Sequence, residues 1–212
     1  MLMEDARKEI IEISLWMQEQ GLVVGTAGNV SVRDGDNFAI TPSGVPYEDL
    51  VPEDVVVYNM SGEKVDGELK PSSEFPLHLS VYQNTDAQAI THTHAPASTA
   101  LGLVVDEIPV SHYYSLMFGG PIRVAPYFYF GSDELAKGVT EALRGRTGAL
   151  MKNHGAITIG PTLKKAADML PILEYICEVH LRAMATGTPI ALLSQEEQEQ
   201  AAGPIQSYGN QK

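Results

Sequence analysis

Two histidines, His92 and His94, are separated by a single threonine in the stretch AITHTHAP. The whole chain has only 6 histidines in 212 residues, so a pair this close calls for an explanation. In a β-strand, side chains at positions i and i+2 project from the same face, about 6 to 7 Å apart along the chain. Such a pair can bind one metal ion, or each ring can make a separate hydrogen bond. The pair alone favours neither interpretation.

A metal site with an open position needs further ligands from elsewhere in the chain. His154 in LMKNHGAITIG follows a β-rich run and precedes a glycine that can turn the chain sharply, which would place it at the rim of a sheet. Glu74 in KPSSEFP offers a carboxylate that could complete the coordination or act as a base. Three histidines and a glutamate suit Zn²⁺, and Fe, Co or Mn could replace it. Taken singly, a loop histidine and a helix-starting acid remain the simpler interpretations.

Three clusters of glycine, hydroxyl and amide residues, in GTAGNVSVR, TPSG and PSSE, each adjoin a predicted strand or helix. Backbone N–H groups and hydroxyls of this kind can bind one phosphate group. The candidate residues are Gly28, Asn29, Ser43, Gly44, Ser72 and Ser73. If Ser72 and Ser73 open a helix, its positive end would also face the phosphate. Any one cluster alone would be interpreted as an ordinary turn.

Composition limits the class of protein. Hydrophobic residues make up 44% and charged residues 19% of the chain, which predicts one folded domain over residues 1–212. The lone Cys177 excludes an internal disulfide and fits a reducing compartment. The first residues do not resemble a secretory signal, no apolar run approaches the ~18 residues that span a bilayer, and the net charge of −13 argues against nucleic acid. We therefore expect a cytoplasmic protein that binds neither membrane nor nucleic acid.

Hydrophobic periodicity predicts alternating helices and strands. Ala6, Ile10, Ile13 and Met17 have helical spacing, with Gly21 beyond the helix end. Short β-rich runs are NVSVR, NFAITP, DVVVYNM, AQAITHTH, IRVAPY, GALMKNH and AITIG. Further helices are predicted in SSEFPLHLSVYQ, in GSDELAKGVTEALRG and in the acidic tail LLSQEEQEQAAG. These elements indicate an α/β sandwich built on one sheet, whose strand order the pattern does not reveal.

The longest helix should run from about Thr162 to Thr186, and Pro171 should kink it or limit its start. Four other residues with chemical potential are best interpreted as packing: Trp16, His78, Cys177 and His180. His112 either lines a site or is an ordinary strand histidine.

The ordered motifs GTAGNVS, TPSG, PSSE, HTHA and NHG, at these spacings, resemble the class II aldolase family over nearly the whole chain. The resemblance implies a single α/β/α sandwich around a largely antiparallel sheet, of the class II aldolase and adducin type. It also implies a homotetramer with active sites at the subunit interfaces.

The same resemblance implies roles for particular residues. Zn²⁺ would be held by His92, His94 and His154, with Glu74 as a displaceable fourth ligand that becomes the acid/base. The six candidate phosphate residues named above would bind the substrate phosphate. Tyr113 in IPVSHYYSL would reach the site of a neighbouring subunit, and Tyr208 in QSYGN would be a second catalytic tyrosine.

The implied reaction is reversible retro-aldol cleavage of a ketose 1-phosphate, first of all fuculose 1-phosphate, to dihydroxyacetone phosphate and lactaldehyde. Cleavage beside a ketone leaves negative charge on an enediolate, which a Lewis-acidic metal stabilises without a Schiff-base lysine. In this direction Tyr113 would accept the proton of the C4 hydroxyl and Glu74 would protonate the enediolate.

Related activities remain open. Pentulose-phosphate 4-epimerases typically read SSD where this chain reads PSSE, methylthioribulose-1-phosphate dehydratases keep the metal histidines, and adducin-like scaffolds lack them. The family often reads HHG where this chain has Asn153 before His154. By the same resemblance, the stretch MFGGPIRVAPYFYFGS lies near the sugar-facing wall of the site and is slightly short after its glycines, which leaves the aldehyde preference open.

Overall fold

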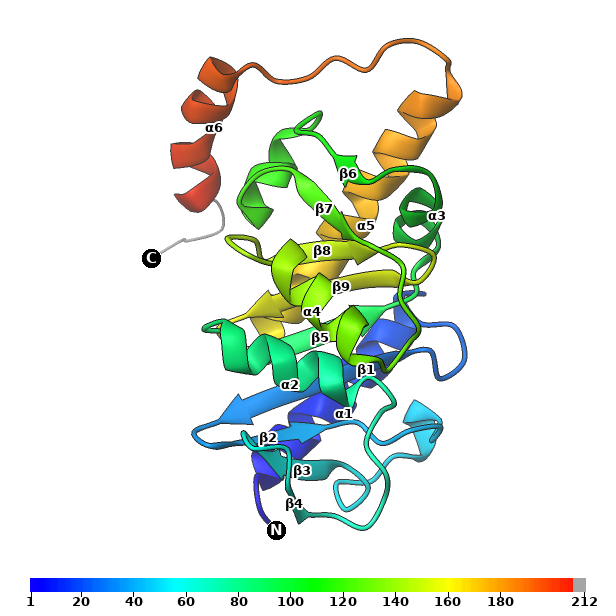
Figure 1. Cartoon of the computed structure of the whole chain (residues 1–212), viewed down its shortest axis with the longest axis vertical. Helices are drawn as coiled ribbons and strands as arrows, with labels where there is room; N and C mark the ends of the chain where they lie inside the picture. Colours follow the sequence, from blue (N-terminus) through cyan, green and yellow to red (C-terminus); the bar gives the residue numbers. More distant parts are fainter. Residues whose placement is uncertain (208–212) are drawn as a thin grey trace.

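A single nine-stranded sheet forms the centre of the computed structural model, which describes residues 1–207 (Figure 1). It contains the seven β-rich runs of the sequence and two short strands that were not predicted, Lys64–Asp66 and Glu107–Ile108. The strands are β1 Gly28–Asp34, β2 Asn37–Ile40, β3 Val56–Asn59, β4 Lys64–Asp66, β5 Ala89–Thr93, β6 Glu107–Ile108, β7 Ile122–Ala125, β8 Gly148–Met151 and β9 Gly155–Gly160. Their order across the sheet is β4-β3-β2-β1-β5-β9-β8-β7-β6. Every neighbouring pair is antiparallel except β7 and β8. The largely antiparallel sheet is therefore confirmed.

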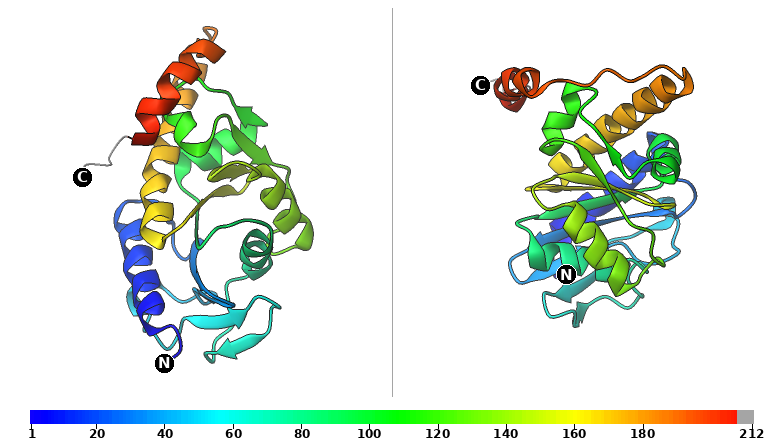
Figure 2. Two further views of the ribbon diagram at one scale, coloured as in Figure 1. Left: turned by 90° about the vertical axis from the view of Figure 1, so that its left-hand side faces the viewer. Right: turned by 45° about the horizontal axis from the view of Figure 1, so that its top comes forward.

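Helices cover both faces of this sheet. On one face lie α1 Glu4–Glu19, α3 Pro96–Val104 and α5 Leu163–Ala185, and on the other lie α2 Phe75–Asn84 and α4 Asp133–Ala142. The left view of Figure 2 shows α1 and α5 on one side of the sheet and α2 and α4 on the other. Each layer encloses apolar side chains against the strands, so the predicted α/β/α sandwich is confirmed.

Hydroxyl side chains cap two of these helices as the sequence predicts. Ser132 accepts a hydrogen bond from the backbone N–H of Leu135 at the start of α4, and Thr162 accepts one from Lys165 at the start of α5. Helix α5 continues through Pro171, so this proline does not limit its start.

Helix α2 begins at Phe75, so the expectation that Ser72 and Ser73 open it is wrong. The backbone just before the helix is already paired with the segment after β2. The N–H of Ser72 donates to the carbonyl of Thr41 at 3.0 Å, and the N–H of Ser43 donates to the carbonyl of Lys70 at 3.1 Å. Residues 41–43 and 70–72 thus form a short antiparallel bridge around Pro42 and Pro71, and the helix begins only after this extended segment.

The buried stripe of α1 also differs from the predicted one. Ile10 and Met17 are buried, but the other buried positions are Arg7 and Ser14, while Ala6 and Ile13 are only partly covered. Arg7 is 1% exposed because its guanidinium donates to the carbonyls of Leu2 and Pro52 and to the carboxylate of Asp66.

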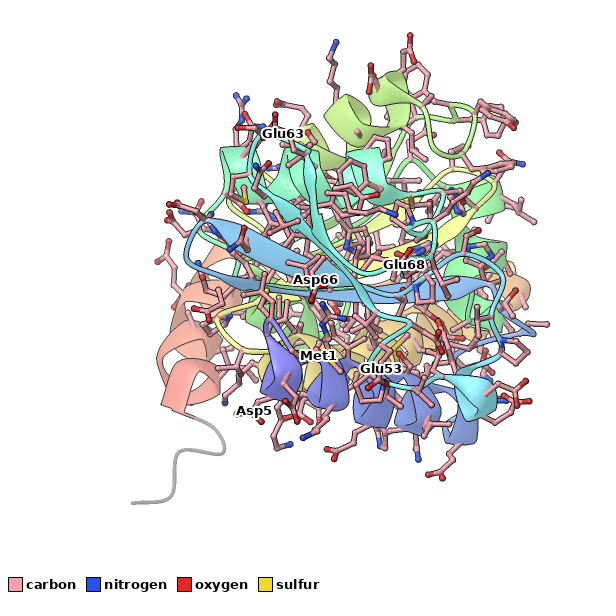
Figure 3. All side chains as sticks on the ribbon, turned by 90° about the horizontal axis from the view of Figure 1, so that it is seen from below. Met1, Asp5, Glu53, Glu63, Asp66 and Glu68 are labelled. Carbon is pink, nitrogen blue, oxygen red and sulfur yellow. The ribbon has the colours of Figure 1, made fainter. Side chains whose placement is uncertain are left out.

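Charged residues surround the β4 edge of the sheet. Seen from below, Glu63, Asp66 and Glu68 lie along this edge, with Asp5 and Glu53 on neighbouring segments (Figure 3). Asp66 ends β4 and forms the ion pair with Arg7 that joins the edge to α1. Charges on a short edge strand discourage pairing with a second sheet.

The far end of the molecule carries two short elements beyond the sheet. The 3₁₀ segment η2, Tyr113–Phe118, packs against the last helix α6, Gln195–Ser207, which an extended segment connects to α5 (Figure 2). The predicted acidic tail helix is therefore confirmed, although its Ile205 is buried. Among residues 1–207, no helix is both long and apolar enough to cross a bilayer.

The packing interpretations of Cys177, Trp16 and His180 also hold. Cys177 lies wholly inside the core between α3, α5 and the sheet, and Trp16 of α1 is partly buried against the neighbouring core cluster. His180 is 5% exposed, and its Nδ1 lies 3.0 Å from the hydroxyl of Ser111.

Candidate active site

Four side chains from three parts of the fold converge at one end of the central strands. His92 belongs to β5 and His94 follows directly after it, His154 ends the turn between β8 and β9, and Glu74 is the N-cap residue of α2. One ligand atom from each lies within 4.8 Å of all the others. The sequence prediction that these four residues come together is thus matched by the fold.

Strand alternation explains the convergence of the first two rings. Residues Ile90, His92 and His94 share one face of β5, the face covered by α2, because alternate side chains point the same way. His92 lies opposite Ile157 of β9, so the turn that starts β9 brings His154 beside the pair. The ring centroids of the three histidines are 4.8 to 5.0 Å apart and the rings stand edge to face.

The turn before β9 is built differently from the sequence expectation. The residue with a left-handed backbone is Asn153, with φ of 56°, and not Gly155. Gly155 is needed because the chains approach closely there: a Cβ atom would lie 2.2 Å from the carbonyl oxygen of Thr93. The glycine therefore lets β9 come near enough to β5 to bring His154 within reach of His92 and His94.

Short polar contacts connect the four residues. The Nε2 atoms of His92 and His94 are 2.9 Å apart. Glu74 Oε2 lies 2.9 Å from Nε2 of His92, and Oε1 lies 3.2 Å from Nε2 of His154. The side-chain amide of Asn29 donates to Glu74 Oε2 at 2.8 Å. Imidazole nitrogens and carboxylate oxygens therefore face one small volume.

Burial and mutual charge shift the pKa values in this cluster. Burial lowers the pKa of His94 and of His154 to about 4, and the nearby His92 adds to both shifts. Burial alone would raise the pKa of Glu74, but the charge and hydrogen bond of His92 lower it below its ordinary value. Burial alone would lower the pKa of His92, but Glu74 raises it. At neutral pH the cluster thus offers two neutral imidazoles and a carboxylate.

This donor set fits a divalent transition metal. The Nδ1–H of His92 donates to the carbonyl of Ala156 at 2.9 Å, which directs the lone pair of Nε2 into the cluster once the ring is neutral. Glu74 Oε1 is buried, and because its 3.2 Å contact with Nε2 of His154 lacks hydrogen-bond geometry, it has no hydrogen-bond partner within the described residues. A metal ion would give that oxygen a partner and would replace the proton shared between His92 and Glu74.

A pocket of about 500 Å³ opens beside the cluster and includes Glu74, His94 and His154 in its lining. All six residues predicted to bind phosphate line the same pocket: Gly28, Asn29, Ser43, Gly44, Ser72 and Ser73. Two of these glycine and hydroxyl segments come from the ends of β1 and β2 and the third precedes α2. A pocket that places these segments next to a metal-type cluster suits a phosphorylated substrate.

Residues 8–181 match the family model described as Class II Aldolase and Adducin N-terminal domain. The chain belongs to this family. It is 36% identical to a 5-deoxy-D-ribulose 1-phosphate aldolase of Bacillus thuringiensis serovar kurstaki, with 100% of both chains covered. It is 38% identical to an L-fuculose phosphate aldolase of Escherichia coli strain K12, covering 95% of this chain and 94% of the other. A solved L-fuculose 1-phosphate aldolase superposes with a TM-score of 0.92 at 34% identity, covering 97% and 98%.

The stretch that the resemblance placed near the sugar-facing wall does supply part of the pocket lining of this class II aldolase, although its individual residues were not singled out from the sequence. Tyr127, Phe128 and Phe130 line the pocket, together with Thr26 and Asn153. The aromatic run PYFYF was the available signal, since Tyr127 and Phe130 keep 61% and 51% of their surfaces exposed in one chain. These rings give a polar pocket one apolar side.

Tyr113, one of the two tyrosines predicted to be catalytic, is not among the residues that line the pocket of its own chain. Tyr113 is 44% exposed at the start of η2, where it stacks on His112 and contacts Tyr114. His112 thus belongs to this aromatic group and not to the pocket lining. Tyr208 lies outside the described residues. The roles given to both tyrosines remain predictions.

Proposed function

We propose that this class II aldolase reversibly cleaves a ketose 1-phosphate to dihydroxyacetone phosphate and a short aldehyde. One observation carries the proposal: Glu74, His92, His94 and His154 converge beside the pocket formed by the three glycine and hydroxyl segments. A substrate whose phosphate contacts these segments would have its neighbouring carbon atoms near the cluster.

Each of the chain's own residues has a defined task in this proposal. His92, His94 and His154 would hold a divalent metal, most simply Zn²⁺, with Glu74 as a fourth, displaceable ligand. The bound ion would supply Lewis acidity at the carbonyl and hydroxyl oxygens of the ketose. Glu74 would carry the proton to and from the carbon of the three-carbon fragment. The buried position of Glu74, 4% exposed, keeps water away from that proton transfer.

The second proton would be handled by a tyrosine. We propose Tyr113 of a neighbouring subunit, which accepts the proton of the C4 hydroxyl in the cleavage direction, with Tyr208 as a second tyrosine at the site. The exposure of Tyr113 supports this proposal, because the side chain is available to a second chain. We accordingly propose a homotetramer with sites at its interfaces, formed by single domains of residues 1–212 in the cytoplasm.

The substrate we propose first is L-fuculose 1-phosphate, which gives L-lactaldehyde. The 5-deoxyribulose 1-phosphate named for the Bacillus relative is the second candidate, because that relative aligns over the full length of both chains. Both sugars end in a methyl group, which the apolar wall of Tyr127, Phe128 and Phe130 suits. The two therefore differ mainly in the length of the aldehyde.

A coupled assay for dihydroxyacetone phosphate tests the proposal. Purified, zinc-loaded protein should release this product from fuculose 1-phosphate or from 5-deoxyribulose 1-phosphate, and the ratio of the two kcat/KM values identifies the better substrate. Epimerised but uncleaved pentulose phosphate would identify an epimerase instead, and loss of water from methylthioribulose 1-phosphate would identify a dehydratase. No turnover together with no bound metal would support an adducin-like scaffold.

A further inference from the structure

His78 was expected to serve packing, yet it is the middle member of a buried chain of hydrogen bonds that ends on Glu74. The ring is fully buried on α2, over β1. Its Nε2 lies 2.5 Å from Oδ1 of Asn29, whose amide nitrogen bonds Glu74. Its Nδ1 lies 2.6 Å from the hydroxyl of Ser31, which lies 2.7 Å from the hydroxyl of Tyr82.

The direction of every bond in this chain follows from its last member. An ionised carboxylate only accepts, so Asn29 must turn its NH₂ group to Glu74 and its carbonyl oxygen to His78. His78 must then carry its proton on Nε2, which leaves Nδ1 as an acceptor. Ser31 must therefore donate to Nδ1, and Tyr82 must donate to Ser31.

We propose that His78 is a positioning residue that holds Glu74 in place through Asn29. With its Nε2–H on the Asn29 carbonyl, His78 prevents the amide from rotating, since a rotated amide would place NH₂ against N–H and oxygen against the carboxylate. Both clashes are costly for side chains buried this deeply, since Asn29 and Glu74 are each only 4% exposed. The inference concerns the same cluster as the proposed function and rests on it for the role of Glu74.

The strands make this connection rigid. Ser31 and Asn29 are alternate residues of β1, so both face α2, and Asn29 lies directly opposite His92 of β5. One strand thus presents both hydrogen-bond partners of His78, and the helix that carries His78 also begins next to Glu74. If Glu74 moved relative to His92, the hydrogen bonds from His78 through Asn29 to Glu74 would have to break.

Two conservative variants separate positioning from packing. In His78→Gln the terminal amide occupies the place of Nε2 and can still donate to Asn29, whereas in His78→Asn the shorter side chain reaches only toward Ser31. A matched control is Thr158→Val, which removes a buried hydroxyl on the opposite face of the sheet, where Thr158 bonds Thr91 at 2.6 Å. The control should lose stability without affecting Glu74.

We expect the affinity for Zn²⁺, measured by competition with a chelator, to fall roughly 10- to 100-fold in His78→Asn and to stay near the wild-type value in His78→Gln and Thr158→Val. The ¹⁵N shifts of His78 in the metal-free protein should show the Nε2–H tautomer. In the aldolase assay, kcat should fall in His78→Asn more than KM changes.

Equal zinc affinity in His78→Asn and His78→Gln, or an Nδ1–H tautomer in the wild-type protein, would overturn the inference. If His78→Asn does not fold, Ser31→Ala takes its place, because it removes the donor to Nδ1 and should weaken zinc binding while Tyr82→Phe changes it less. The zinc and tautomer measurements need no substrate, so they judge His78 even if no ketose phosphate is cleaved.

Discussion

At the scale of single residues, the role of Glu74 is the most direct test of the chemistry. Glu74→Gln keeps the size of the side chain but removes a carboxylate that can take up and release a proton. We expect kcat for dihydroxyacetone phosphate release to fall by about 10²- to 10⁴-fold. Glu141→Gln is the control, since Glu141 is an exposed carboxylate paired only with Arg144. Activity within tenfold of wild type, at equal metal content, would contradict the role of Glu74 as acid/base.

His78 also predicts how stability depends on pH. Burial lowers its pKa from the ordinary 6.5 to about 3, against a smaller opposing effect of the Glu74 carboxylate, and His92 adds to the lowering. At pH values between about 3 and 6.5, the His78 ring is protonated in the unfolded chain but neutral in the folded chain. The free energy of unfolding therefore decreases as the pH falls below 6.5. The polar groups in contact with His78, the Ser31 hydroxyl and the Asn29 amide, do not titrate in this range.

The measurement is urea unfolding of the metal-free protein at pH 7 and at pH 4.5. From pH 7 to 4.5, wild type should lose about 2.5 kcal/mol more than His78→Gln, which lacks the titrating ring. The other five histidines are the same in both proteins, so the difference isolates His78. Parallel pH curves for the two proteins would show that this ring gains its proton as readily in the folded state as in the unfolded state.

The four proposed metal ligands could be singled out from the sequence, but the hydrogen bonds of His78 could not. The i, i+2 spacing of His92 and His94 is a local signal, and the ordered motifs supplied His154 and Glu74. The hydrogen bonds of His78 form only because α2 packs over β1, which brings His78 next to Ser31. No local sequence pattern reveals how these two elements pack. The aromatic wall of the pocket was predictable only in part. The run PYFYF is visible in the sequence, but which of its rings face the pocket is not.

At the scale of elements, the approach of β9 to β5 sets the geometry of the site. Gly155→Ala would place a methyl group 2.2 Å from the carbonyl of Thr93, so the two strands must separate. We expect a loss of about 1 to 3 kcal/mol in the free energy of unfolding and a weaker affinity for Zn²⁺. Gly203→Ala in α6 is the control, since an added methyl meets nothing within 4 Å there. Unchanged zinc affinity in Gly155→Ala would mean that the turn can shift without moving His154.

Most elements follow from periodicity and turn residues, and the exceptions have physical causes. Helix α2 starts only at Phe75 because residues 70–72 pair with residues 41–43. Those partner residues are about 30 positions away in the sequence, so a local pattern cannot reveal the pairing. Arg7 is buried in α1 because three acceptors from other segments surround it. The strand order was not predictable, because adjacent strands such as β5 and β9 are far apart in sequence.

At the scale of the whole molecule, the proposed sharing of a site between subunits can be tested by mixing. Chains carrying Tyr113→Phe keep Glu74, and chains carrying Glu74→Gln keep Tyr113. In mixed oligomers with sites between neighbours, about one quarter of the sites would contain both intact residues. We expect activity in the aldolase assay to recover to that extent after the two inactive proteins are unfolded and refolded together. Verified mixed oligomers without recovered activity would place both residues in the same chain or exclude Tyr113 from the site.

Metal removal has a predictable effect on the whole fold. The proposed ligands extend from residue 74 to residue 154 and lie on three separate elements, so an ion would connect parts of the sheet that are distant in the chain. At a free Zn²⁺ concentration 100 times the dissociation constant, the free energy of unfolding should be about 2.7 kcal/mol higher than with a chelator. Identical melting temperatures with and without zinc, at a concentration shown to saturate binding, would contradict a site formed only in the native state.

The position of β5 between β1 and β9 has a consequence for how the protein matures. The complete set of donors exists only after β9, the last strand to leave the ribosome, has entered the middle of the sheet. An ion at the proposed site would therefore not guide the early collapse of the chain, as zinc does in small zinc-dependent domains, and it would bind only after the core has assembled. If the proposed site is correct, the enzyme would first fold without metal, and its activity would then depend on how much metal is available to it.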